Sequence, residues 1–216
     1  GSGLVGSEMC IRDRFCILPF EVEFFRSLDY PVDYVGNPSV DSVAYYREKQ
    51  MVGPDIFRED EGLDCRPVLA LLAGSRRQEI KDNLPTMLKV AAAYPGYQPV
   101  IAGAPGLEPE YYKQYIGDAD VKIVFGKTYP LLSHSDAALV TSGTATLETA
   151  LFRVPQVVCY YVAAGRVASF IFRHFFHTKY ISLVNLIAGR EVVQELFGVR
   201  FSYSQIHDEL GRVLND

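Results

Sequence analysis

One short segment of this 216-residue chain, TSGTATLE at 141–148, combines residue types that bind anions. Gly143 lets the backbone approach a ligand closely, and the hydroxyl of Ser142 or Thr144 can cap a helix that begins there. A helix N-terminus presents unpaired amides to an anion such as a phosphate. The segment therefore predicts an anion site formed by the first amides of a helix, those of Thr144, Ala145 and Thr146.

Glu148 lies four residues after Thr144, on the same face of that helix. A carboxylate at this place can accept two hydrogen bonds from ribose hydroxyls next to the phosphates. An ordinary capped helix, with a Glu that the helix dipole favours, explains the same residues. For this motif alone, the ordinary helix is the better interpretation.

A second segment, AGSRRQE at 73–79, brings positive charge. Gly74 permits a turn, Ser75 can cap a helix, and Arg76 then starts it. The helix dipole disfavours a cation at this end, so an arginine there suggests an anionic ligand, although most such arginines are surface residues. A guanidinium matches phosphate oxygens bidentately.

A third segment, 180–196, holds Asn185 in an apolar run, followed by Gly189, Arg190 and Glu191. A buried amide side chain needs hydrogen-bond partners or a ligand. We expect the three residues that follow to open a helix.

The elements that would position these segments alternate regularly. Apolar or β-branched runs predict parallel strands at 67–72, 99–102, 121–125, 136–140 and 155–161. Helices are expected between them, at 76–92, 111–116, 129–134, 145–152 and 192–197. Pro85 should interrupt or restart the first of these, with Asn83 as its cap. This succession predicts an α/β fold with a doubly wound parallel sheet, whose glycine-containing turns meet at one edge.

The remaining residues are expected to contribute less. Strands are predicted at 15–20 and 32–36, a helix at 41–50 and a linker at 51–65. Residues 1–14 contain a literal G-x-G-x-x-G, but no strand precedes it, so we interpret this stretch as a non-native or disordered leader.

Composition excludes several classes of protein. With 49% hydrophobic and 22% charged residues, the chain is neither disordered nor fibrous. No uncharged apolar run approaches the ~20 residues of a transmembrane helix. A net charge of −5 argues against nucleic-acid binding. The four cysteines form no Cys-x-x-Cys motif, which predicts reduced thiols in the cytosol.

Residues 149–190 are basic and aromatic, and contain no Asp or Glu. This composition fits an interfacial helix attracted to anionic lipid, and equally a buried helix whose arginines extend to solvent. His174 and His177 form a His-x-x-His, but without a third ligand nearby no metal site is expected.

Five blocks together resemble the lipid-A-disaccharide synthase family, bacterial glycosyltransferases that make the disaccharide core of lipid A. They are ILPFE (17–21), DYVGNP (33–38), LLAGSRRQEI (71–80), DAALVTSGTATLETAL (136–151) and SLVNLIAGREVVQEL (182–196). The resemblance covers residues 15–216. Its last block is highly specific, whereas SGT…E is shared with other GT-B glycosyltransferases.

The resemblance implies a GT-B fold of two Rossmann-like lobes that face a cleft. Residues 15–65 would be a remnant of the N-terminal lobe and a linker, and 66–216 the C-terminal UDP-sugar-binding lobe, truncated at its end. The implied reaction joins UDP-2,3-diacylglucosamine to 2,3-diacylglucosamine 1-phosphate with inversion and release of UDP, using no cofactor or metal ion. The chain alone is expected to bind UDP without transferring sugar.

The resemblance also implies a cytoplasmic protein that contacts the anionic inner-membrane surface peripherally. Its partners would be UDP-diacylglucosamine and a lipid acceptor, and it would bind no nucleic acid. Whether the protein forms a homodimer stays open. There are three alternatives. One is another GT-B UDP-sugar enzyme, such as a UDP-GlcNAc 2-epimerase, and another is a non-catalytic nucleotide-binding or lipid-docking module. The third, a Rossmann dehydrogenase, is disfavoured because no G-x-G-x-x-G stands between a strand and a helix.

Carried over residue by residue, Arg76 corresponds to the family's phosphate-contacting arginine and Glu148 to its ribose-binding acid. Asn185 matches the asparagine of the family's NLIAGRE block, important for donor binding or catalysis. Asn37, where many members have His, receives no role. The predicted substrate site comprises Gly74, Ser75, Arg76, Ser142, Gly143, Thr144, Ala145, Thr146, Glu148, Asn185 and Arg190.

Overall fold

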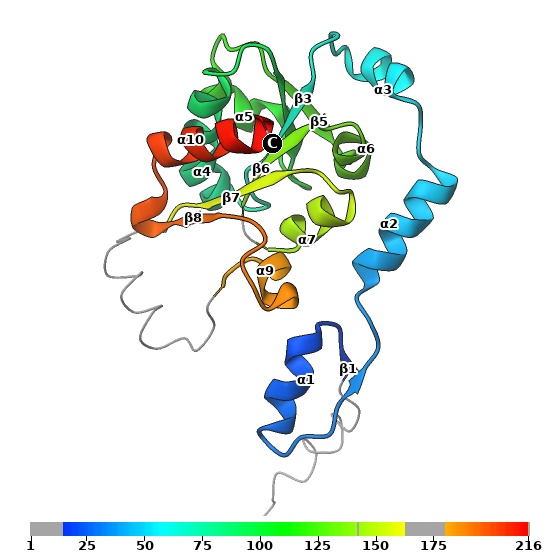
Figure 1. Cartoon of the computed structure of the whole chain (residues 1–216). Coiled ribbons are helices and arrows are strands. Elements are labelled where there is room, and N and C mark those ends of the chain that lie inside the picture. The colour runs from blue at the N-terminus through cyan, green and yellow to red at the C-terminus, as the bar shows by residue number, and fades with distance from the viewer. Residues whose placement is uncertain (1–14, 142, 163–179, 216) are drawn as a thin grey trace, which may run out of the picture. The chain divides into compact units, whose positions relative to one another are not determined.

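The computed structural model describes residues 15–141, 143–162 and 180–215, and these fall into two compact units (Figure 1). The first ends at Ser42 and the second begins at Val43. We expected the division after residue 65. The structure places it earlier because Val43, Tyr46 and Phe57 are buried in the core of the second unit.

The first unit contains a single β-α-β succession within its described residues. Strand β1 (Phe15–Cys16) pairs in parallel with β2 (Asp33–Tyr34), and helix α1 (Pro19–Arg26) connects them. Both predicted strands are therefore present, but each is only two residues long. Helix α2 (Pro38–Lys49) then leads into the second unit.

The second unit is built on a sheet that has six parallel strands among the described residues, in the order β5-β4-β3-β6-β7-β8. All five strands predicted for this part of the chain are present, and the predicted doubly wound α/β fold is confirmed. The strands are β3 (Val68–Leu72), β4 (Gln98–Gly103), β5 (Lys122–Phe125), β6 (Ala137–Val140), β7 (Gln156–Tyr160) and β8 (Glu195–Phe197).

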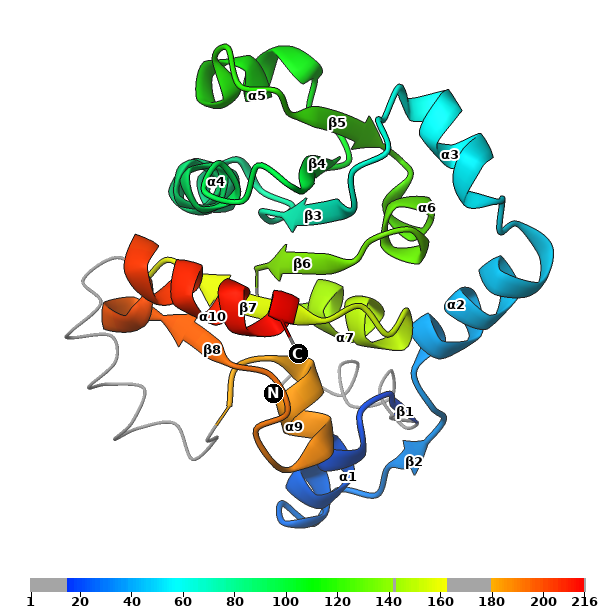
Figure 2. The ribbon, with the colours of Figure 1, turned by 45° about the horizontal axis from the view of Figure 1, so that its top comes forward.

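Helices cover both faces of this sheet. The helices that begin in this unit are α3 (Pro54–Glu61), α4 (Arg77–Ala91), α5 (Pro109–Ile116), α6 (Thr128–Ser133), α7 (Thr144–Leu151), α9 (Leu183–Ala188), which packs on α7, and α10 (Tyr203–Asn215), with a 3₁₀ turn η2 (Gly198–Arg200). Figure 2 shows α4 and α10 on one side of the strands and α6 and α7 on the other.

The side chains of β3 explain why two layers of helices are needed. Leu69 and Leu71 pack with α4, α5 and α10. Val68, Ala70 and Leu72 point the other way and pack with α3, α6 and the end of α7. Every residue of β3 is buried. Successive side chains of a strand face opposite sides, so a run that is apolar at every position must be covered twice.

The segment 51–65 is not the linker that its Gly, Pro and acidic residues predicted. It contains α3, and the same residue types define its ends. Gly53 is the N-cap, Pro54 is the first helical residue, and Gly62 ends the helix in the left-handed conformation at φ 62°.

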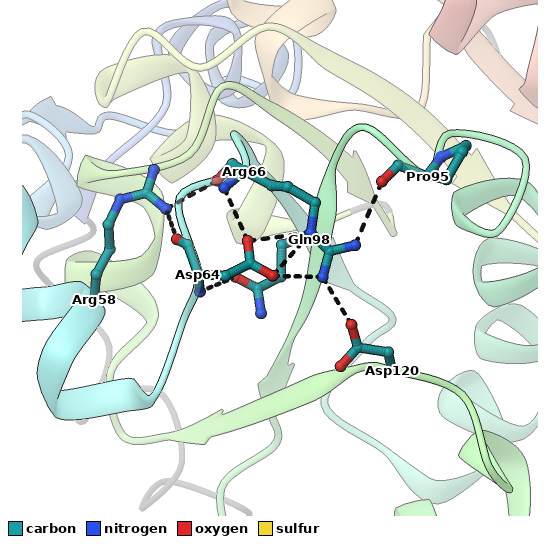
Figure 3. Close-up of polar contacts among 6 residues, drawn as sticks. All are labelled: Arg58, Asp64, Arg66, Pro95, Gln98 and Asp120. Atoms are coloured by element: carbon teal, nitrogen blue, oxygen red, sulfur yellow. Dashed lines mark hydrogen bonds and ion pairs between the residues drawn. The ribbon is translucent and has the colours of Figure 1, made fainter.

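A polar network centred on Arg66 ties this segment to the end of the sheet opposite the strands' carboxyl termini (Figure 3). The Arg66 guanidinium contacts Asp64 at 2.6 Å and Asp120, before β5, at 2.7 Å. The buried Gln98 side chain accepts a hydrogen bond from the Asp64 amide at 2.9 Å. Hydrogen bonds from Arg66 lower the pKa of the Asp64 carboxyl.

Helix α4 runs without interruption through Pro85, contrary to our expectation. Its face holding Ile80, Leu84 and Met87 is fully buried, and this packing outweighs the hydrogen bond that proline cannot donate. Asn83 is not a cap. It lies inside the helix, donates to the Glu79 carbonyl at 2.7 Å and accepts from the Tyr161 amide at 2.7 Å.

The predictions of a helix at 192–197 and of one that begins at Gly189 are also wrong. Gly189 instead ends α9 in the left-handed conformation, φ 63°. Residues 195–197 form β8, which pairs with β7 in parallel. This short segment becomes a strand because an open sheet edge lies beside it.

Some predictions fall on residues outside those described: the leader at 1–14, and most of the basic aromatic stretch with His174 and His177. Among the described residues, no helix is both long enough and apolar enough to cross a bilayer.

Candidate functional site

A cleft of about 490 Å³ lies at the carboxyl ends of β3, β4 and β6. In the sheet, β3 stands between β4 and β6, so the chain leaves β3 toward one face and β6 toward the other. The loops diverge there and leave a crevice, the usual ligand position in open α/β sheets. The lining residues are Leu72, Gly74, Ser75, Arg76, Glu79, Ala102, Gly103, Ala104, Pro105, Thr128, Thr141, Gly143, Thr144, Ala145 and Glu148.

The loop after β3 is shaped around the carboxylate of Glu79. Its Oε2 accepts hydrogen bonds from the amides of Ser75 at 2.8 Å and Arg76 at 3.3 Å. Gly74 makes this possible: its φ is 117°, and a Cβ there would lie 2.5 Å from the Cβ of Glu79. Glycine is required both for the backbone conformation and for the space.

Arg76 stands at the rim of the cleft as the residue before α4, which begins one residue later than we predicted. Its side chain is 82% exposed, and Nη1 lies 3.6 Å from Oε1 of Glu79. An ion pair this long and exposed holds the guanidinium only weakly. The group can therefore turn toward an anion in the cleft.

Across the cleft, Gly143 is the N-cap of α7, with φ 124° and ψ −158°. Thr144 is the first residue of the helix and so is not its cap. With Ala145 it lines the cleft at the end where helix amides point outward. The Thr146 hydroxyl instead donates to the Gly143 carbonyl at 2.8 Å and fixes the turn. Ser142 lies outside the described residues.

Glu148 lines the same cleft and is half-buried. The hydroxyl of Tyr129, on α6, donates a hydrogen bond to its Oε1 at 3.0 Å. Burial raises the pKa of the Glu148 carboxyl, and the hydrogen bond from Tyr129 opposes part of that rise. The carboxylate is thus held in one orientation in a site where its charge is disfavoured.

The two predicted residues from the third segment do not line this cleft. Asn185 is fully buried: its Nδ2 donates to the Val193 carbonyl at 2.8 Å and to Glu195 at 2.9 Å, and its Oδ1 accepts from the amides of Val192 and Val193. The partners that the sequence required are therefore in the protein. Arg190 is exposed beyond the end of α9.

Glu195 is the centre of that second cluster. Its buried carboxylate accepts from the Ser182 hydroxyl at 2.7 Å and from the amides of Ile181 and Ser182. A buried carboxylate is tolerated when such donors surround it. The cluster fixes α9 against β8.

Glu79 was expected to pair with Arg76 or Arg77, and it contacts Arg76. Its hydrogen bonds to the loop amides were not foreseen, although an acidic residue three positions after a helix cap is a common N-terminal pattern. Sequence reasoning gave no role to Thr141 in the cleft or to Tyr129 in its support. Thr141 is the first letter of the TSGT segment. Nothing in the sequence indicated Tyr129, because it reaches Glu148 from another helix.

Known proteins resemble this chain over most of its length. A family model described as lipid-A-disaccharide synthetase (LpxB) matches residues 9–215. The chain belongs to the lipid-A-disaccharide synthase family. Relatives of that name include proteins from Myxococcus xanthus, 38% identical over 92% of this chain, and Anaeromyxobacter dehalogenans, 35% identical over 95%. The chain spans about half of their length, 52% and 54%.

Solved structures with the same fold are much more distant in sequence. The UDP-GlcNAc 2-epimerase from Neisseria meningitidis aligns with a TM-score of 0.63 at 14% identity, over 94% of this chain and 52% of its own. WaaG, a glycosyltransferase of lipopolysaccharide biosynthesis, aligns with a TM-score of 0.57 at 13% identity, over 94% and 53%. They support a Rossmann-like fold for this lipid-A-disaccharide synthase family member.

We predict that Asn185→Ala lowers stability rather than acting on a ligand. The change leaves the Glu195 carboxylate and two amides short of partners in the interior, at a cost of about 2–4 kcal/mol. The melting temperature should fall by roughly 5–12 °C. Thermal unfolding measures this, with exposed Arg190→Ala as the control. An unchanged melting temperature with weakened UDP binding would contradict the structural role.

Glu148→Gln should raise the melting temperature at pH 7.5, because burial disfavours the charged carboxylate that the neutral amide replaces. A carboxyl whose pKa is raised in the folded state destabilises the protein at pH values above that pKa. Below the pKa of the unfolded chain, near 4.5, the carboxyl is protonated in both states and the destabilisation disappears. The gain should therefore shrink at pH 4. Tyr129→Phe should lower the melting temperature at pH 7.5, because the Glu148 carboxylate loses its hydrogen-bond donor. Equal gains at both pH values would refute the electrostatic origin.

Proposed function

We propose that this chain carries the UDP-sugar-binding half of a lipid A glycosyltransferase. The reaction joins UDP-2,3-diacylglucosamine to 2,3-diacylglucosamine 1-phosphate and releases UDP. The observation that supports the proposal most directly is the single cleft where Arg76, the start of α7 and Glu148 converge. These groups come from two separate stretches of chain, the loop after β3 and helix α7, and each suits a different part of UDP.

The diphosphate would lie between Arg76 and the first amides of α7. When the bond from the sugar to the diphosphate breaks, negative charge develops on the departing oxygen. Fixed donors that face this charge stabilise the transition state more than the bound substrate. A guanidinium and a helix N-terminus supply positive potential without a proton transfer.

The ribose would be held by Glu148. An ionised carboxylate accepts hydrogen bonds only, which suits two neighbouring sugar hydroxyls. Because Tyr129 occupies Oε1, the carboxylate is already oriented before the ligand arrives. Burial disfavours the charged form of this carboxylate. Hydrogen bonds from the ribose hydroxyls would stabilise the charged form, so binding would recover part of the free energy that burial costs.

Inverting transfer also needs a base for the acceptor hydroxyl. The two carboxylates lining the cleft are already engaged, Glu79 by the loop amides and Glu148 by Tyr129. We place the base in the half of the family's proteins that this chain does not span. This chain would then contribute donor binding and leaving-group stabilisation.

UDP should bind the 216-residue chain, and Arg76→Ala should weaken the binding roughly tenfold to a hundredfold. One hydrogen-bonded charge pair is worth about 1.5–3 kcal/mol. Isothermal titration calorimetry with UDP measures the affinity. Arg77→Ala is the matched control: this neighbouring arginine stacks on the Tyr111 ring at 4.8 Å and does not line the cleft.

Two results would contradict the proposal. One is a folded chain that gives neither heat nor a thermal shift with millimolar UDP. The other is an equal loss of affinity for Arg76→Ala and Arg77→Ala, because general loss of positive charge would then explain the effect.

We also propose peripheral binding to anionic membrane surfaces, supported by the five basic residues and eight aromatic residues in 149–190. The chain should float with vesicles that contain anionic phospholipid at low salt and largely detach at about 0.5 M salt. Vesicles of phosphatidylcholine alone are the control. Equal flotation with both vesicle types, or none with either, would argue against an electrostatic surface contact.

A further inference from the structure

Thr141 lies between the two loops to which the proposed function assigns the diphosphate. It directly follows β6, and its amide donates to the carbonyl of Leu72, the last residue of β3, at 2.9 Å. The loop of Arg76 begins just after Leu72, and the turn to α7 begins just after Thr141. Both Leu72 and Thr141 line the cleft, so the pair forms its floor at the strand ends.

The hydroxyl of Thr141 has no hydrogen-bond partner, although the residue is only 2% exposed. Within the described part of the chain, two other buried side-chain atoms share this condition, Nε2 of His134 and Oε1 of Gln156. Neither of those residues lines the cleft. Other hydroxyls near this site, those of Thr146 and Thr149, donate to backbone carbonyls at 2.8 and 2.7 Å.

An unpaired buried hydroxyl is unfavourable for folding, because the group has lost water and gained nothing. Valine has nearly the same shape and would suit this position better in a protein without a ligand. The presence of threonine is explained if the missing partner arrives with the ligand. Thr141 lines the cleft, and rotation about its Cα–Cβ bond would turn the hydroxyl toward the cavity.

We propose that the Thr141 hydroxyl donates a hydrogen bond to an anionic oxygen of the bound diphosphate. This inference rests on the proposed UDP site. It adds a neutral donor on the floor to the positive groups on the walls, Arg76 and the start of α7. A hydroxyl there recognises a phosphate oxygen at short range, whereas the rim arginine attracts the charge from a distance.

The test compares UDP affinity and thermal stability in the 216-residue chain for four proteins: the parent, Thr141→Val, Thr141→Ser and the control Thr149→Val. Thr141→Val should bind UDP roughly tenfold or more weakly and should melt at the same temperature or about 1–2 °C higher. Thr141→Ser, which keeps the hydroxyl, should bind within about threefold of the parent. Thr149→Val should melt lower, since it loses a satisfied bond, and should bind UDP like the parent.

The outcomes separate this inference from the function on which it rests. No UDP binding by the folded parent overturns both. If the parent binds UDP and Arg76→Ala weakens the binding, but Thr141→Val binds within twofold of the parent, only the role of Thr141 is overturned. A loss of equal size for uridine, which has no phosphate, moves the contact to the nucleoside and also overturns the assignment.

Discussion

The proposed anion-binding arrangement depends on one feature of the sheet: β3 and β6 are neighbours, but the chain leaves them toward opposite faces. The hydrogen bond from the Thr141 amide to the Leu72 carbonyl closes the ladder at this point. Beyond it the two loops separate, one carrying Arg76 and the other leading into α7. Neither loop could form a diphosphate site alone, since an exposed arginine and a short helix are common surface features. Their adjacency at the end of two buried strands makes the cleft.

The cleft keeps several groups in a state that costs folding free energy. Burial disfavours the charge of Glu148, and the hydroxyl of Thr141 lacks a partner. Gly74 and Gly143 hold positive φ angles that increase the entropy lost on folding. These costs fall on the lining of one cavity, while β3 and β6 beneath it are apolar and buried at every position. Such a distribution is typical of a ligand site supported by a rigid core.

Polar clusters away from the cleft serve the fold instead. The Arg66 network attaches α3 to the far end of the sheet, and the Glu195 cluster attaches α9 to β8. In both, each named carboxylate has donors from the protein itself. Neither cluster lines the cleft, and neither Asn185 nor Arg190 does. A motif that is specific for a family can therefore mark an architectural cluster as readily as a binding surface.

The amino-acid sequence by itself determined the strand-and-helix alternation of the larger unit, the parallel sheet and the edge at which Gly74, Arg76, Gly143 and Glu148 would meet. It could do so because buried parallel strands are continuously apolar and because glycine turns follow them. Only the tertiary structure decided what depended on distant neighbours: the strand at 195–197, the uninterrupted helix through Pro85, and the partners of Asn185. It alone brought Tyr129 to Glu148 and left the Thr141 hydroxyl unpaired, since such contacts join residues that no local pattern connects.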